Sequence, residues 1–158
     1  MKPFALFGTI VLLSISATAG AAAPDPQVVA PIRQFIDSFN KGDTKAAAAT
    51  HTPSGVTIID EIAPFVWAGP GAFDAWSKAL AAFDQKEGNS DGAVALGEPT
   101  SVYVSGDRGY VVAPVIYTFK TKDVAMRETA QIVVALQKGT GGWKIASWTW
   151  VATTPRKQ

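Results

Sequence analysis

The chain has 158 residues, with 14 basic and 13 acidic side chains and a formal net charge of +1. Such a balance gives no electrostatic basis for binding nucleic acid or an anionic membrane surface. The sequence has no cysteine and a single histidine, which excludes disulfides and thiolate sites and argues against a histidine-built metal site. We therefore expect no metal and no cofactor.

The first residues have the pattern of a secretory signal peptide. Lys2 precedes an apolar run at 4–15, and small residues follow at 17–23. The apolar run is shorter than the ~20 residues that a membrane-spanning helix needs. We predict that residues 1–21 are removed on export, so that the mature protein is secreted or periplasmic, and that residues 25–153 form one domain.

The first half of that domain is predicted to be mainly helical. Aspartate or proline at each start, apolar residues three or four positions apart and a breaker at each end predict helices at residues 26–42, 44–50 and 70–88. Between the second and third helices, the β-branched run that begins at Val56 predicts a strand.

The second half is predicted to consist of strands. β-Branched and aromatic residues dominate it, and turn-forming segments divide it into strands at 93–104, 110–120, 124–138 and 143–152. Helices followed by a run of long strands indicate an α+β domain in which the helices pack on one face of an antiparallel sheet.

Three motifs occur in a fixed order: FNKGD at the end of the first helix, VTIID leading to VWAGPGAFDAW, and the closing GGWKIASWTW. In this order they resemble the nuclear-transport-factor-2-like superfamily, in its SnoaL-like and ketosteroid-isomerase-like branch. The resemblance implies a curved antiparallel sheet wrapped around the N-terminal helices into a cone, an internal ligand cavity and frequent dimerisation through the outer sheet face. That superfamily includes isomerases, cyclases, dehydratases, epoxide hydrolases and non-enzymatic binders, so the fold does not specify a reaction.

The resemblance to ketosteroid isomerase places Asp60 at the position of the general base. An aspartate in an apolar cavity could have a raised pKa and move a proton next to a carbonyl group. The isomerase's two oxyanion donors correspond here to Phe35 and Ile132, which cannot donate a hydrogen bond, so steroid-type isomerisation is not expected. Because adjacent strand residues point to opposite faces, Glu61 is predicted to face solvent.

Alternation along the last two strands gives further expectations. Glu128 falls on the apolar, inward set, where it either projects into the cavity opening or lies in solvent at a frayed strand end, and Arg127 points outward. In the last strand, Ser147 falls on the inward face. Trp148 and Trp150 then lie on the outer face, where they would form a homodimer interface unless a loop or terminus covers them.

The remaining candidates are aromatic residues and the one histidine. Trp67 and Tyr117 could line an apolar pocket, although aromatic residues at such positions are commonly core. His51 lies in a polar turn and is expected to be a surface or capping residue. We expect ligand contacts from five residues in all: Phe35, Trp67, Tyr117, Glu128 and Ser147.

Two functions from different classes remain open. The first is a secreted protein that binds a small apolar or aromatic molecule without catalysis, which the missing oxyanion donors favour. The second is a lyase or isomerase that acts on a small carbonyl-containing metabolite with Asp60 as the general base.

Overall fold

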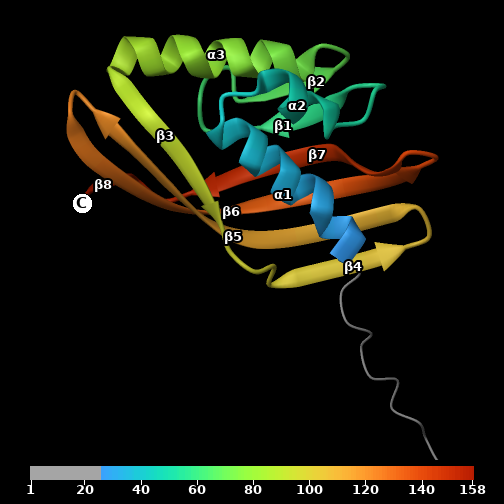
Figure 1. Ribbon diagram of the computed structural model, residues 1–158. Helices are drawn as coiled ribbons and strands as arrows, with labels where there is room; N and C mark the ends of the chain where they lie inside the picture. The colour runs from blue at the N-terminus through green and yellow to red at the C-terminus, as the bar shows by residue number, and fades with distance from the viewer. Residues whose placement is uncertain (1–25) are drawn as a thin grey trace, which may run out of the picture.

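The computed structural model describes residues 26–158, so the predicted signal peptide at 1–21 lies outside the described residues. The helices are α1 (Pro26–Asn40), α2 (Thr44–Ala49) and α3 (Ala72–Glu87), and they lie on one side of a curved, open sheet (Figure 1). The α+β arrangement predicted from the sequence is therefore confirmed. Across residues 26–158, no helix is long and apolar enough to cross a membrane.

The sheet has eight strands in the order β2-β1-β7-β6-β5-β3, with β4 paired to β5 and β8 paired to β6. Its strands are β1 (Val56–Ile59), β2 (Val66–Gly69), β3 (Asn89–Leu96), β4 (Ser101–Ser105), β5 (Arg108–Thr121), β6 (Val124–Gly139), β7 (Gly142–Ala152) and β8 (Arg156–Lys157). All neighbouring pairs are antiparallel except β1 and β7, which run parallel. This parallel pair thus joins the first strand of the chain to its last long strand.

Two predicted strands are each divided in the structure. The predicted strand at 93–104 is broken by the GEPT segment, whose Pro99 has no N–H to donate to a ladder, and β3 and β4 pair with different parts of β5. The run that begins at Val56 forms the hairpin of β1 and β2. Gly55 lies at the open end of this hairpin, against the backbone of Gly69. A Cβ added at Gly55 would come within 2.3 Å of the Gly69 carbonyl carbon, so the close approach needs glycine.

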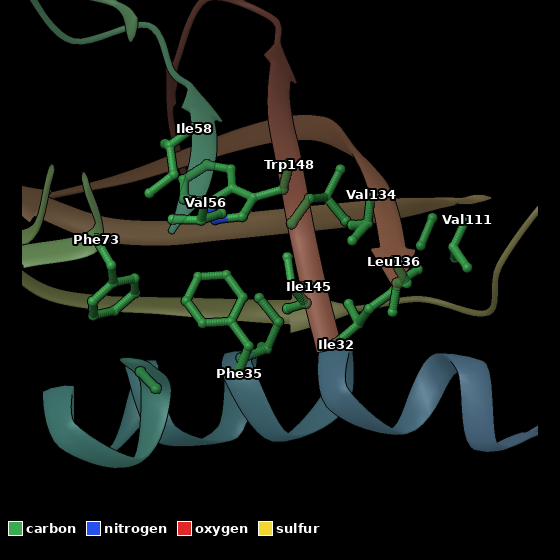
Figure 2. Close-up of a cluster of buried hydrophobic side chains, with 14 of the residues drawn as sticks. Ile32, Phe35, Val56, Ile58, Phe73, Val111, Val134, Leu136, Ile145 and Trp148 are labelled. Atoms are coloured by element: carbon green, nitrogen blue, oxygen red, sulfur yellow. The ribbon is translucent and has the colours of Figure 1, made fainter. Parts of the chain in front are cut away.

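The core lies between α1 and the concave face of the sheet. Ile32 and Phe35 point from α1 toward Ile145 and Trp148 of β7 (Figure 2). The helix approaches β5 closely, since a Cβ at Gly109 would come within 2.7 Å of Val28 Cγ2. The apolar stripe predicted from helical spacing is therefore the stripe that meets the sheet.

The end of α1 is tied to the edge strand β3 by one side chain. Asn40 donates through Nδ2 to the carbonyl oxygen of Val94, and its Oδ1 accepts from the Val94 N–H, both at 2.8 Å. This pair of bonds occupies backbone groups of β3 that β5 does not use. It therefore fixes the distance between the helix layer and β3, which are two walls of the site described below.

A β-bulge reverses the predicted faces of the second half of β7. On β6, the neighbouring residues Leu136 and Ala135 pair with Ile145 and Ser147 of β7. Ala146 lies between these two pairs without a partner of its own, so β7 has one extra residue there. One extra residue exchanges the inward and outward sets beyond it. Trp148 is consequently only 2 % exposed in the core, and Trp150 packs against the core rather than facing outward.

Because of the bulge, the prediction that Trp148 and Trp150 form a homodimer interface is wrong. Neither indole is available on the outer face, so these two residues cannot provide that contact. Dimerisation itself stays a prediction.

Deleting Ala146 tests the role of the bulge. The deletion restores regular alternation and drives Trp148 toward the outer face, so we expect the free energy of unfolding to fall by about 3 kcal/mol or more. Ala146→Ser, which keeps the residue count, should cost less than about 1 kcal/mol. Urea denaturation measures both, and a deletion variant as stable as Ala146→Ser would contradict the assignment.

Candidate functional site

A cavity of about 280 Å³ opens between α1, α3 and the strands β3, β5, β6 and β7. Much of its wall is aromatic or aliphatic, with the following side chains: Phe35, Ile36, Phe39, Ile62, Trp76, Leu80, Phe83, Val94, Tyr117, Phe119, Met126, Ile132, Trp148, Trp150 and Pro155. Such a wall favours an apolar occupant, and the size suits a small molecule.

The aromatic side chains pack on one another in a connected network. The ring of Trp148 contacts Phe35 at 5.7 Å and Trp76 edge-on at 5.0 Å between centroids. On the other side, Tyr117 stacks on Phe119 at 4.8 Å and meets Trp150 edge-on at 6.4 Å. These contacts hold both walls in place, because packed aromatic rings have few alternative rotamers in a dense core.

Asp60 follows the last residue of β1 and reaches the cavity. Its Oδ2 accepts a 2.6 Å hydrogen bond from Trp76 Nε1 of α3, and its Oδ1 accepts one from the Glu61 N–H at 2.6 Å. Burial raises the pKa of Asp60 above its ordinary value, while these hydrogen bonds oppose the rise. The hydrogen bond from the Trp76 indole therefore fixes the orientation of the Asp60 carboxyl group.

Glu128 and Glu61 form a pair of carboxyl groups at the same cavity. Glu128 is 2 % exposed and accepts a 2.7 Å hydrogen bond from Trp150 Nε1. Burial, the charge of Glu128 and a hydrogen bond to it raise the pKa of Glu61 to about 7. Burial also raises the pKa of Glu128, although the hydrogen bonds with Trp150 and Glu61 oppose the rise. The two carboxyl groups therefore share a proton through the hydrogen bond between them.

Two further groups extend the acidic character along the cavity. Asp84 of α3 accepts a hydrogen bond from Asn89 Nδ2 at 3.2 Å, and burial raises its pKa. The pKa of Tyr117 is also raised, first by burial and then by the charges of the surrounding acids. The phenol therefore stays protonated and can donate a hydrogen bond at any physiological pH.

Four of the predicted site residues line this cavity: Asp60, Phe35, Tyr117 and Glu128. Trp67 and Ser147 do not line it. Trp67 is a buried core residue of β2, and the bulge in β7 turns Ser147 to the side opposite Trp148. For Glu128, the inward alternative is the one observed.

Sequence reasoning missed several lining residues. Glu61 was expected to face solvent, but β1 ends at Ile59, so strand alternation does not extend to it and its carboxyl turns to the cavity although much of the residue is exposed. Trp76 belonged to a predicted apolar stripe, yet nothing in that pattern indicated a hydrogen bond to Asp60. Asp84 lies on the same helix, about two turns beyond Trp76. This helical spacing was the one sequence signal that could have placed Asp84 at the site.

Of the two expected positions of His51, the surface position is wrong, whereas a capping contact with the end of α2 is present. His51 is 6 % exposed and packs against Phe73 at 4.8 Å and Phe35 at 5.1 Å. Its Nδ1 lies 3.0 Å from the Ala47 carbonyl oxygen, and burial lowers its pKa to about 4. His51 is thus a neutral core residue outside the cavity lining.

Within residues 26–158, no group of three or more histidine, cysteine, aspartate or glutamate side chains is arranged to hold a metal ion.

Comparisons with known proteins give the fold. No family model matches the chain, and no curated protein matches it. Among solved structures, it is similar to a ketosteroid isomerase-like protein from Erwinia carotovora atroseptica SCRI1043, with a TM-score of 0.64, 22% identity and coverage of 82% of this chain and 96% of that one. An NTF2-like protein with a cystatin-like fold from Novosphingobium aromaticivorans gives a TM-score of 0.63 at 13% identity, covering 79% of each chain. An NTF2-like protein of unknown function from Shewanella oneidensis MR-1 gives 0.55 at 18% identity, covering 79% and 96%. The chain has the nuclear-transport-factor-2-like fold that its motifs resemble.

The raised pKa of Glu61 predicts how stability depends on pH. The folded state keeps the Glu61 proton up to about pH 7, whereas the unfolded state loses it near its ordinary value of 4.5. Ionisation therefore costs folding stability as the pH rises from about 4.5 to 7. Glu61→Gln should remove this cost, so the variant gains on the order of 1 kcal/mol relative to the wild type over that range, an amount discounted for partial solvent exposure.

The free energy of unfolding of Glu61→Gln must be compared with that of the wild type at each pH. His51 has the opposite effect, because its lowered pKa makes the fold lose stability as the pH falls from 6.5 toward 4. That contribution is common to both proteins and cancels in the difference. Urea denaturation at pH 4.5, 6 and 7.5 gives the values, and a difference that does not change with pH would contradict the Glu61 assignment.

Proposed function

We propose that the protein is exported by its N-terminal signal peptide and binds a small apolar or aromatic molecule in the cavity of about 280 Å³. The observation that carries this proposal is the preformed, largely apolar wall, which α1, α3 and the strands β3, β5, β6 and β7 hold in place. A ligand that enters transfers its apolar surface from water to this wall, which contributes about 25 cal/mol for each Å² buried. The tyrosine and carboxyl groups would orient it.

The fold neighbours are consistent with a binding role but do not define it. They range from an isomerase-like protein to one of unknown function, and each is less than 25% identical to this chain. Only the cavity of this chain therefore supports a binding function.

Filling the cavity tests the binding proposal. Leu80 lines the cavity from α3, whereas Ala81, the next residue, is exposed. With 2-phenylethanol as the probe and NMR chemical-shift titration as the measurement, Leu80→Trp should weaken binding at least about tenfold, because the larger ring occupies the ligand's space. Ala81→Trp is the matched control and should change the affinity less than about twofold. Equal affinities for the two variants would count against the cavity as the binding site.

A proton-transfer enzyme is the second candidate, and one observation favours it. Asp60 has a raised pKa inside an apolar cavity, which suits a general base, and the neutral member of the Glu61–Glu128 pair lies at the same cavity. Asp60 would remove a proton from the carbon next to a carbonyl group, and a neutral carboxyl or the Tyr117 phenol would donate a hydrogen bond to the enolate oxygen. Phe35 and Ile132 line the cavity but cannot supply that bond.

Deuterium exchange separates the two candidates. If the protein is an enzyme of this kind, it should speed the exchange of the α-protons of 4-phenyl-2-butanone in D₂O, followed by NMR. Asp60→Asn should then lower the protein-dependent rate by about 100-fold or more while the fold is retained. Exchange no faster than in buffer, or unaffected by Asp60→Asn, would leave binding as the function.

A further inference from the structure

The charge of the cavity is unusual for a site with an apolar wall. Five acidic residues line it, from the turn after β1, from α3 and from β6: Asp60, Glu61, Asp84, Glu87 and Glu128. None of the lining residues, all within residues 26–158, is a lysine or an arginine. The four salt bridges formed in this part of the chain involve none of the five except Glu87, whose partner Lys86 is an exposed neighbour.

Buried carboxyl groups without a basic partner are costly when ionised. Burial raises the pKa of Asp60, Glu61, Asp84 and Glu128, so each group binds a proton more tightly than it would in water, and such protons offset the cost. A positive charge brought in by a ligand would do the same as these protons. Its single charge would attract all three of Asp60, Glu61 and Glu128, because these groups interact with one another.

The aromatic side chains at this end of the cavity are suited to the same charge. The indoles of Trp76 and Trp150 point their N–H groups at Asp60 and Glu128, so each ring lies beside a carboxyl group. The electron-rich faces of such rings attract organic cations, and the attraction strengthens where water is excluded. Carboxyl groups and aromatic faces therefore favour the same class of ligand.

We propose that the cavity selects an organic cation: a small molecule with an aromatic or aliphatic body and an ammonium group that lies among Asp60, Glu61 and Glu128. This inference rests on the proposed binding function and adds the charge of the ligand to it. A bare metal ion does not fit, because these residues are not arranged as metal ligands in the described part of the chain. An anionic ligand meets only like charge.

Binding of an ammonium ion is expected to release a proton. The O–H bond of Glu61 breaks, its electron pair stays on the carboxylate, the proton goes to solvent, and the ammonium group takes its place. The titratable groups that face the site are Asp60 and Glu61 after β1, Asp84 and Glu87 on α3, Tyr117 on β5 and Glu128 on β6. Since Glu61 titrates near 7, the affinity for an ammonium ion should rise between pH 5 and pH 8.

Three probes of one shape test the inference: 2-phenylethylammonium, 2-phenylethanol and phenylacetate, which are a cation, a neutral molecule and an anion. Isothermal titration calorimetry of the purified protein at pH 7.5 should show the ammonium binding at least about tenfold tighter than the alcohol, with the anion weakest. The ammonium affinity should also fall at pH 5, while the probe itself remains charged, as aliphatic amines do.

A charge-neutral variant locates the effect. Glu61→Gln should remove most of the preference for the ammonium over the alcohol, measured as the ratio of the two affinities in the same variant. Asp37→Asn is the matched control, because it removes one negative charge from the exposed side of α1, outside the cavity lining, and should leave the preference unchanged.

The outcomes separate this inference from the proposed function. If the alcohol binds and the ammonium binds no tighter, or if the anion binds best, the cation inference is overturned while the binding function stands. If none of the three probes binds, both are overturned. A preference that Glu61→Gln and Asp37→Asn reduce equally would also overturn the assignment to this carboxyl cluster.

Discussion

The extra residue at Ala146 decides which side chains of β7 reach the interior. Without it, regular alternation would place Trp148 and Trp150 on the outer face of the sheet. With it, Trp148 completes the aromatic network around Phe35, and Trp150 gives Glu128 a hydrogen-bond donor. A buried carboxyl group without that donor would be more costly, so the acidic end of the cavity depends on the same bulge. One irregular residue thus sets both the shape and the chemistry of the site.

Function and stability act against each other at this site. Raised pKa values show that the fold gains nothing from ionising these carboxyl groups, whereas a cationic ligand would require them to be ionised. Sites whose local chemistry costs stability are common where a ligand supplies the missing interaction. The surrounding structure offsets the cost through the packed aromatic walls and through Asn40, which fixes α1 to β3.

Much of the fold could be predicted from the sequence, because helical spacing, strand alternation and turn residues are local signals. The helices and the long strands follow from them, whereas alternation left open whether Glu128 enters the cavity or lies in solvent at a frayed strand end. The face of Trp148 and Trp150 could not, since a bulge is fixed by pairing with β6 and leaves no mark in the alternation of β7 alone. The predicted orientation of Glu61 was wrong for a related reason. Strand β1 ends at Ile59, so the alternation of strand residues does not extend to Glu61. The site itself needed the structure, because its carboxyl groups and their indole partners are far apart in the sequence.

The central claim is that an apolar cavity holds a carboxyl pair that shares a proton near neutral pH. An NMR titration of the Glu61 side-chain carboxyl carbon, in protein with ¹³C-labelled glutamate and with Glu61→Gln to assign the signal, tests it most directly. The account predicts a midpoint near 7. A midpoint at the ordinary value of about 4.5 would show that Glu61 is solvated and unpaired, and would contradict the account.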